Sequence, residues 1–155
     1  MAGVSHFASM EVEGGPQYTG RPAEMIGFVD AAKKAVMHNY ANFNGRASRS
    51  EYWWLFLFQM LVFIPASILD GVTGIALIDA GFGVTYGPFY ILSLLGLFLP
   101  ALSAGVRRLH DSGRSGWWYF IWLVPCVGPI ILLVFLIQDG QPHPNDYGEV
   151  PTNTL

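Results

Sequence analysis

Three long runs without a charged residue constrain the fold of this 155-residue chain more than any other feature. They cover residues 52–69, 80–106 and 115–138. Charged residues make up only 12% of the chain, against roughly 25% in an ordinary soluble domain, and the mean hydropathy is +0.39. A soluble fold of this size needs a polar shell, and this chain lacks the charges to form one. The runs therefore predict an integral membrane protein built from helices.

The first two runs each contain a stretch long enough to cross a bilayer. At about 1.5 Å per residue, residues 52–69 extend roughly 27 Å, close to a hydrocarbon thickness of about 30 Å. The second run begins with a glycine-rich stretch, so its span is expected at residues 87–106. Pro88 suits the first helical turn, and Pro100 predicts a kink within the helix.

The third run is expected to form a span over residues 117–137, but it has two readings. Pro125, Gly128 and Pro129 fall at its centre. They either kink one crossing or turn a re-entrant hairpin. We favour the crossing, because a lipid-exposed break would leave backbone groups without hydrogen bonds. Cys126, the one cysteine of the chain, is expected to be a small buried apolar residue.

The remaining segments are expected to lie outside the hydrocarbon core. Residues 1–22 are predicted to form a disordered tail, residues 23–138 the membrane domain, and residues 139–155 a polar C-terminal tail. Within residues 24–41, apolar side chains recur at gaps of three and four, which places them on one helical face: Met25, Phe28, Val29, Ala32, Val36 and Tyr40. An interfacial amphipathic helix fits this pattern, as does a helix packed on protein. The expected fold is all-α, a membrane bundle of three transmembrane helices plus this N-terminal interfacial helix.

The positive charges fall into two groups that indicate the orientation of the chain. Five precede the first span, three occupy the loop between spans two and three, and none lies elsewhere: Arg21, Lys33, Lys34, Arg46, Arg49, Arg107, Arg108 and Arg114. By the positive-inside rule, the N-terminus and the 107–116 loop face the cytoplasm. With three crossings, the acidic connector and the C-terminal tail face outward. Tryptophan pairs at 53–54 and 117–118 directly follow the two basic groups, as expected for anchors at one interface.

Two polar motifs and a third near the C-terminus resemble a known family. The stretches YANFNGRASRSEYWW (residues 40–54), RRLHDSGRSGWW (residues 107–118) and NDYGEVP (residues 145–151) together resemble domain-of-unknown-function family 805, the YhaH-like proteins. The resemblance runs from about Phe28 to Pro151 and implies a small multi-span protein of a bacterial inner membrane, without implying an activity. It singles out Gly45, Arg46, Arg49, Glu51, Tyr52, Trp53, Arg107, Arg108, Leu109, His110, Asp111, Gly113, Ser115, Gly116, Trp117, Asn145, Tyr147 and Gly148.

The antiparallel order of consecutive spans predicts a cluster of charges at the interface. The start of the first span and the end of the second lie at one depth, so Glu51 is a candidate partner for Arg107 or Arg108. We expect Glu51 and Asp111 to neutralise some of the arginines, since a lone buried charge is costly. The full candidate cluster is Arg46, Arg49, Glu51, Tyr52, Trp53, Arg107, Arg108, His110, Asp111, Arg114, Trp117 and Trp118.

Chemistry at this cluster is not expected. His110, Asp111, Ser112 and Ser115 are neighbours within one turn, which does not suit a catalytic triad. The histidines at 6, 38, 110 and 143 lack metal-ligand spacing, and phosphate-binding glycine motifs are absent from the sequence. We therefore predict no enzyme, no cofactor, no metal and no nucleic-acid partner.

The expected function is binding at a membrane surface. The cytoplasmic Arg/Trp face is predicted to bind anionic phospholipid headgroups, or a partner that is a second copy or another membrane protein. The alternative is a subunit of a small oligomeric channel or transport component, and a membrane-embedded enzyme ranks third.

Overall fold

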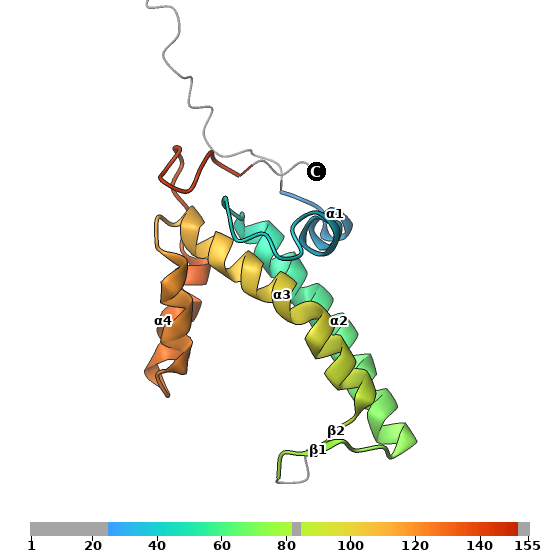
Figure 1. Cartoon of the computed structure of the whole chain (residues 1–155). Helices are drawn as coiled ribbons and strands as arrows, with labels where there is room; N and C mark the ends of the chain where they lie inside the picture. Colours follow the sequence, from blue (N-terminus) through green and yellow to red (C-terminus); the bar gives the residue numbers. More distant parts are fainter. Residues whose placement is uncertain (1–24, 82–84, 152–155) are drawn as a thin grey trace, which may run out of the picture.

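The computed structural model describes residues 25–81 and 85–151, and the predicted tail of residues 1–22 lies outside them. The described residues are mostly helical (Figure 1). In chain order the elements are α1 (Phe28–Lys33), the π-helical turn η1 (Lys34–His38), α2 (Arg49–Thr73), β1 (Ile78–Asp79), β2 (Thr85–Tyr86), α3 (Pro88–Asp111), the 3₁₀ helix η2 (Gly116–Leu123) and α4 (Val127–Ile137).

Two long antiparallel helices, α2 and α3, form the body of the molecule (Figure 1). Both are long and apolar enough to cross a membrane, with 25 and 24 residues. Pro65 and Pro100 lie inside them. A two-residue antiparallel pairing of β1 with β2, Ile78 opposite Tyr86, closes the connection between the helices. This connection and the basic motifs therefore lie at opposite ends of the α2–α3 pair, which we call the connector end and the basic end.

The connector end is held by a carboxylate that the sequence analysis did not single out. Asp70 is 6% exposed and lies in the last turn of α2. Its two oxygens accept hydrogen bonds from the backbone N–H groups of Phe89 (3.0 Å) and Tyr90 (2.8 Å), at the start of α3. Asp70 thus caps the next helix across the connector, a role usually filled by the residue directly before a helix. That residue is Gly87 here, which has no side chain to act as a cap.

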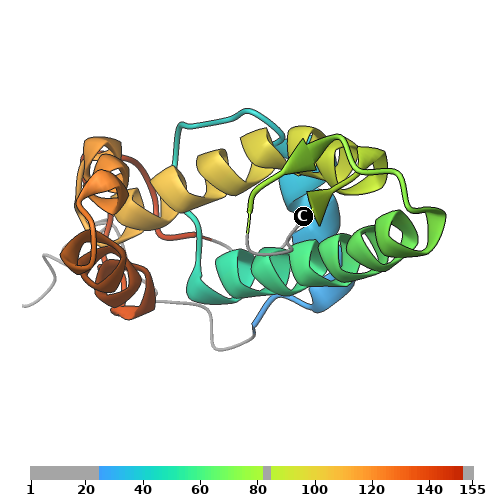
Figure 2. The same cartoon turned by 90° about the horizontal axis from the view of Figure 1, so that it is seen from below.

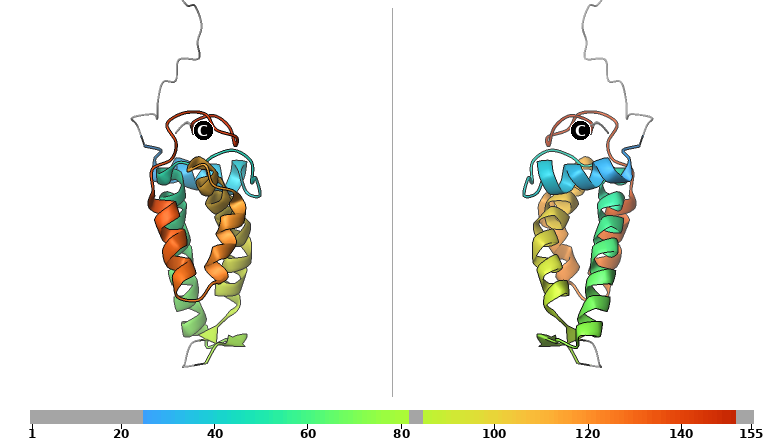
Figure 3. Two further views of the ribbon diagram at one scale, coloured as in Figure 1. Left: turned by 90° about the vertical axis from the view of Figure 1, so that its left-hand side faces the viewer. Right: turned by 90° about the vertical axis from the view of Figure 1, so that its right-hand side faces the viewer.

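The third apolar run folds back on itself, which corrects the expectation of a single kinked crossing over residues 117–137. Figure 3 shows η2 descending from the basic end and α4 returning to it. Each arm is about 16 Å long, roughly half of a hydrocarbon core. Viewed from the connector end in Figure 2, the η2–α4 hairpin stands to one side of the α2–α3 pair.

The position of the C-terminal segment changes with this hairpin. The backbone N–H of Gln141 donates to the carbonyl of Asp111 over 2.8 Å, so residue 141 lies beside the end of α3. The described part of the C-terminal tail therefore shares the basic end with the 107–116 loop. The prediction that the two segments lie at opposite ends was wrong, because it assumed a third crossing.

Close backbone contacts explain why these residues form a hairpin. Cys126 turns the chain with φ 66°, is exposed, and so is not the buried residue expected from its apolar surroundings. A Cβ on Gly128 would lie 1.9 Å from the carbonyl oxygen of Ile121. The two arms thus approach to a distance that only glycine permits. On α3, a Cβ on Gly105 would lie 2.3 Å from the Tyr119 ring, which lets η2 pack directly on that helix.

The N-terminal helix α1 lies across the basic end, over the ends of α2 and α3 (Figure 3). This placement is the one expected of an interfacial helix. Its packed face differs from the predicted one: Ala31 and Ala35 are fully buried, whereas Met25 and Val29 are 81% and 57% exposed. Alanine lets the helix approach its neighbours closely, and of the larger apolar side chains, Ile26 is buried and the ring of Phe28 contacts those of Trp54 and Phe58. The hydroxyl of Tyr40 donates to the Gly96 carbonyl (2.7 Å) and ties the following loop to α3.

Candidate functional site

The start of α2 is fixed by its own sequence. Ser48 precedes the helix, and its hydroxyl oxygen accepts a hydrogen bond from the backbone N–H of Glu51 (3.2 Å). A serine followed three residues later by glutamate is a typical helix start, and an acidic residue in the first turn complements the helix dipole. The cap places the carboxylate of Glu51 at the basic end, on the side that faces α3.

Glu51 meets Arg107 there, as the antiparallel order predicted. Its Oε1 lies 2.7 Å from Nη1 of Arg107, and its Oε2 lies 3.5 Å from Nζ of Lys34. The Glu51 side chain is 1% exposed and that of Arg107 is 3% exposed. One carboxylate therefore links the N-terminal helical segment, α2 and α3 inside the protein. Nε and Nη2 of Arg107 are buried and have no hydrogen-bond partner among the described residues.

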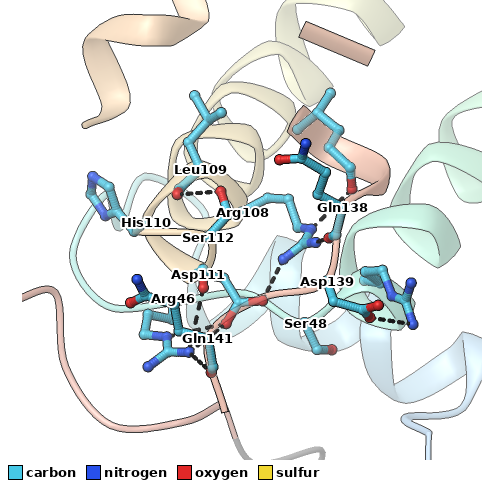
Figure 4. Close-up of polar contacts among 12 residues, drawn as sticks. Arg46, Ser48, Arg108, Leu109, His110, Asp111, Ser112, Gln138, Asp139 and Gln141 are labelled. Atoms are coloured by element: carbon cyan, nitrogen blue, oxygen red, sulfur yellow. Dashed lines mark hydrogen bonds and ion pairs between the residues drawn. The ribbon is translucent and has the colours of Figure 1, made fainter. Parts of the chain in front are cut away.

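Asp111 forms a second pair of contacts, with Arg46 and Arg108 (Figure 4). Nη2 of Arg46 lies 2.9 Å from Oδ1 of Asp111, and Nε of Arg46 lies 3.1 Å from the same oxygen, so both nitrogens donate to one carboxylate oxygen. Arg108 binds the other carboxylate oxygen. All three side chains are 0% exposed. Asp111 thus joins the loop before α2 to the last turn of α3.

The same two arginines bind backbone carbonyls of the returning chain. Nε of Arg108 donates to the carbonyl of Leu136 (3.0 Å), and its Nη2 donates to that of Gln138, at the C-terminus of α4. Arg46 donates to the carbonyls of Gln141 and His143. A cation at a helix C-terminus is favourable because the carbonyl dipoles point toward it. The arginines therefore hold the hairpin and the C-terminal segment at the basic end.

We call these six side chains the buried ionic network: Lys34, Arg46, Glu51, Arg107, Arg108 and Asp111. Its four cations outnumber its two carboxylates, which leaves a formal charge of two positive units. The carbonyl oxygens around Arg46 and Arg108 offset part of that excess. Burial of this kind does not fit the expectation that these arginines face lipid headgroups. These arginines instead hold parts of the protein together. The sequence did not reveal this role, because every residue type has a backbone carbonyl and a carbonyl partner therefore leaves no pattern in the sequence.

The other predicted site residues lie outside the buried ionic network. Arg49 is at the surface, where it pairs with Asp139 (2.7 Å), and the two side chains are 48% and 75% exposed. The guanidinium of Arg114 lies 4.1 Å from the centre of the Phe135 ring. Trp117 and Trp118 are exposed, and Tyr52 and Trp53 are half-buried. The cluster predicted as one unit is therefore divided: five of its residues belong to the buried ionic network, Tyr52 packs against the apolar core, and most of the others lie at the surface.

His110 belongs neither to the buried ionic network nor to the surface residues, because its contacts are with the loop before α2 and with the C-terminal segment. Its Nδ1 lies 3.1 Å from the carbonyl oxygen of Gly45, and its ring stacks on Tyr147 with centroids 4.0 Å apart. The side-chain amide of Asn145 donates to the carbonyl of His110 (2.9 Å). Figure 4 shows the imidazole directed away from the contacts between Arg46 and Asp111.

Two open grooves flank the buried ionic network at the basic end. The first, which we call the α2 groove, has a volume of about 460 Å³ and is lined by Met25, Arg49, Trp53, Trp54, Leu57 and Ile137, among others. The second, the α3 groove, has a volume of about 420 Å³ and lies between α3 and η2. Across the described ranges 25–81 and 85–151, no group of three or more His, Cys, Asp or Glu residues is arranged to hold a metal ion.

Comparison with known proteins identifies the family. Residues 40–149 match the family described as "Protein of unknown function (DUF805)". The chain belongs to this family. The match covers both arginine-bearing motifs and most of the C-terminal motif. It therefore includes every residue of the buried ionic network except Lys34.

The relatives of this DUF805 chain include proteins named for the inner membrane. Inner membrane protein YhaI of Escherichia coli (strain K12) is 37% identical over 118 residues, which is 76% of this chain and 92% of that protein. Inner membrane protein YhaH of the same strain is 37% identical over 116 residues, 75% of this chain and 92% of that protein. No solved structure gives a significant match. With its two long apolar helices, the chain is a helical membrane protein of the inner-membrane type.

Proposed function

We propose that this protein binds anionic phospholipid at the cytoplasmic face of the inner membrane, and that the α2 groove is the binding site. The observation that carries the proposal is the combination of side chains in that groove. A half-exposed guanidinium, that of Arg49, stands beside two indole rings and the apolar side chain of Leu57. The groove thus offers a cation for a phosphate and an apolar wall for an acyl chain, as a phospholipid requires.

The charge distribution supports a cytoplasmic position for this end. All described Lys and Arg residues belong to the basic end, whereas the connector end carries Asp70 and Asp79. By the positive-inside rule, the basic end then faces the cytoplasm, where anionic lipids give the membrane surface a negative potential. In this orientation Trp53 and Trp54, in the first turns of α2, are expected at the headgroup level, which indole rings prefer.

Arg49 is available to a lipid in a way that the buried arginines are not. Its partner Asp139 is 75% exposed, and an ion pair so exposed contributes about 1 kcal/mol at most. A phosphate of the headgroup layer can therefore replace it. Arg46 and Arg108 are buried, so their role is structural: they help to hold the end of α4 beside the α2 groove. The proposal involves binding alone, without a chemical step.

Lipid retention by the purified protein tests the proposal. The intact protein is prepared in mild detergent, exposed to phosphatidylglycerol or phosphatidylcholine, and examined by native mass spectrometry. We expect preferential retention of phosphatidylglycerol, and Arg49→Gln should weaken it about fivefold, because it removes the groove's cation and with it a phosphate contact of about 1 kcal/mol.

Arg114→Gln is the matched control, because it removes one positive charge from the basic end without altering a residue that lines the α2 groove. It should change retention by less than about twofold. Equal retention of the two lipids, or equal losses in the two variants, would show that the α2 groove is not the site.

A further inference from the structure

The α3 groove has a polar end and an apolar length. Leu102, Val106 and His110 line it at successive turns of one face of α3. Asn44, Ser115 and His110 lie toward the basic end, and Leu102 and Phe120 lie deeper along α3 and η2. This arrangement suits an amphiphile whose head lies at the interface and whose tail runs along α3. It involves none of the residues of the α2 groove.

The residues that line the α3 groove indicate which kind of head group such an amphiphile would have. The described lining contains no Lys, Arg, Asp or Glu, in contrast to the α2 groove with Arg49. A phosphate would find no countercharge there. Four of the lining residues are aromatic instead: Phe43, Trp117, Tyr119 and Phe120. Aromatic side chains gain by stacking on a flat ring, so the groove favours a neutral planar head.

His110 gives this groove a directed hydrogen-bond acceptor. The Gly45 carbonyl can only accept, so its contact with Nδ1 (3.1 Å) places the proton of the neutral imidazole on Nδ1. Nε2 is then an unprotonated acceptor. It faces Gly116, where a Cβ would lie 3.4 Å away, and Gly116 lines the groove. Stacking on Tyr147 fixes the plane of the ring. An acceptor in this place recognises a hydroxyl group.

We propose that the α3 groove binds a neutral, hydroxyl-bearing aromatic ring on an apolar tail, the chemistry of a membrane quinol. The ring lies among the aromatic side chains, and one hydroxyl donates to Nε2 of His110. The tail follows α3 past Leu102 toward the middle of the membrane. The oxidised quinone has carbonyl groups in place of the hydroxyls and cannot make that donation, so the reduced form binds more tightly. This inference is independent of the phospholipid proposal.

Binding of decylubiquinol to the intact protein in mild detergent tests the inference. Isothermal titration should give saturable binding of one molecule per chain, and the oxidised form should bind about fivefold more weakly. Leu102→Trp fills the groove and should weaken binding of the quinol more than tenfold. Leu57→Trp is the matched control, since it adds the same ring to the α2 groove and should leave quinol binding within about twofold of the unaltered protein.

Two substitutions at His110 separate recognition from packing. His110→Asn keeps a donor near the Gly45 carbonyl and removes the group at the Nε2 position, whereas His110→Gln places an amide at that position. We expect about fivefold weaker binding of decylubiquinol for Asn and less than twofold for Gln. Both lose the stack on Tyr147, so a packing effect alone would weaken them equally.

Equal weakening in the two His110 variants would overturn the inference, as would four other results. They are the absence of saturable binding, unchanged binding in Leu102→Trp, equal losses in Leu102→Trp and Leu57→Trp, and displacement of the quinol by a short-chain phosphatidylglycerol at equal concentration. A variant counts only if its melting temperature in detergent stays within about 3 °C of the unaltered protein, and the comparison of decylubiquinol with its oxidised form on the unaltered protein keeps the test decisive if a variant fails to fold.

Discussion

At the scale of single residues, Glu51 is expected to matter most for stability. Glu51→Gln removes the carboxylate that neutralises Arg107 and Lys34 where both Glu51 and Arg107 are nearly unexposed. Leaving a buried cation without its partner costs about 3–5 kcal/mol. Thermal unfolding in detergent should show a large loss of stability. Asp139→Asn provides the control, because its ion pair with Arg49 is exposed and should contribute less than about 1 kcal/mol.

A charge swap tests whether Glu51 pairs directly with Arg107 or whether the fold needs only an acidic residue somewhere near the arginines. Glu51→Arg should abolish most of the folded yield, and adding Arg107→Glu should restore part of it, since the two groups are 2.7 Å apart. Adding Arg108→Glu should not, because Arg108 binds Asp111 and the end of α4. Rescue by Arg108→Glu as strong as by Arg107→Glu would contradict the pairing seen in the structure.

Asp70 provides a second residue-scale prediction, at the connector end. Asp70→Ala removes the acceptor of the Phe89 and Tyr90 backbone N–H groups and should lower the free energy of unfolding by about 1–2 kcal/mol. The comparison is Asp79→Ala. Within the described ranges, the Asp79 carboxylate accepts a hydrogen bond from the exposed N–H of Gly81, and its loss should cost less than about 0.5 kcal/mol. Equal losses in thermal unfolding would mean that Asp70 does not cap α3.

Residues differ in how far their partners could be predicted from the sequence. The contact of Glu51 with Arg107 followed from antiparallel order and opposite charge. The choice between Arg107 and Arg108 did not, because it depends on which face of α3 turns toward α2. Asp70 acts on backbone groups 19 and 20 residues away. Because these partners are backbone N–H groups, which nearly every residue type has, the sequence pattern did not predict this cap.

At the scale of elements, the η2–α4 hairpin depends on its glycine contact. Gly128→Ala places a Cβ 1.9 Å from the Ile121 carbonyl oxygen, so the two arms must separate. The expected loss is about 1–3 kcal/mol in thermal unfolding. Gly71→Ala is the matched substitution within α2, where a Cβ meets no neighbour within 4 Å, and it should stabilise the protein by about 0.5–1 kcal/mol. A neutral Gly128→Ala would argue against this close approach.

The hairpin also shows where element-level prediction failed. The α2 and α3 spans were predictable because each contains an apolar, uncharged stretch long enough to cross a bilayer, without a cluster of proline and glycine at its centre. In the third run, the proline and glycine residues allow either a kink or a turn, and composition does not separate them. Tertiary contacts decide between the two: Arg108 binds the carbonyls of Leu136 and Gln138 and so draws the end of α4 back to the basic end. Those contacts also supply partners for part of the backbone that a re-entrant segment would leave unsatisfied.

At the scale of the whole molecule, two crossings with the basic end in the cytoplasm, as proposed above, predict that the described part of the C-terminal segment faces the same side as the 107–116 loop. Single cysteines introduced by Ala76→Cys, Ser112→Cys and Pro142→Cys, each combined with Cys126→Ser, report these positions. A membrane-impermeant maleimide added to intact cells should label position 76 alone, because the positively charged end is held inside. Positions 112 and 142 should react only after the cells are permeabilised.

The reason for this expectation is the fixed geometry of the basic end. Residue 141 is hydrogen-bonded to residue 111, and Arg46 contacts both Asp111 and His143, so positions 112 and 142 cannot lie on opposite sides of a bilayer. Labelling of position 142 but not 112 from outside would mean that the third run crosses the membrane in the cell. Labelling of 76 and 112 alike would instead contradict the two crossings by α2 and α3.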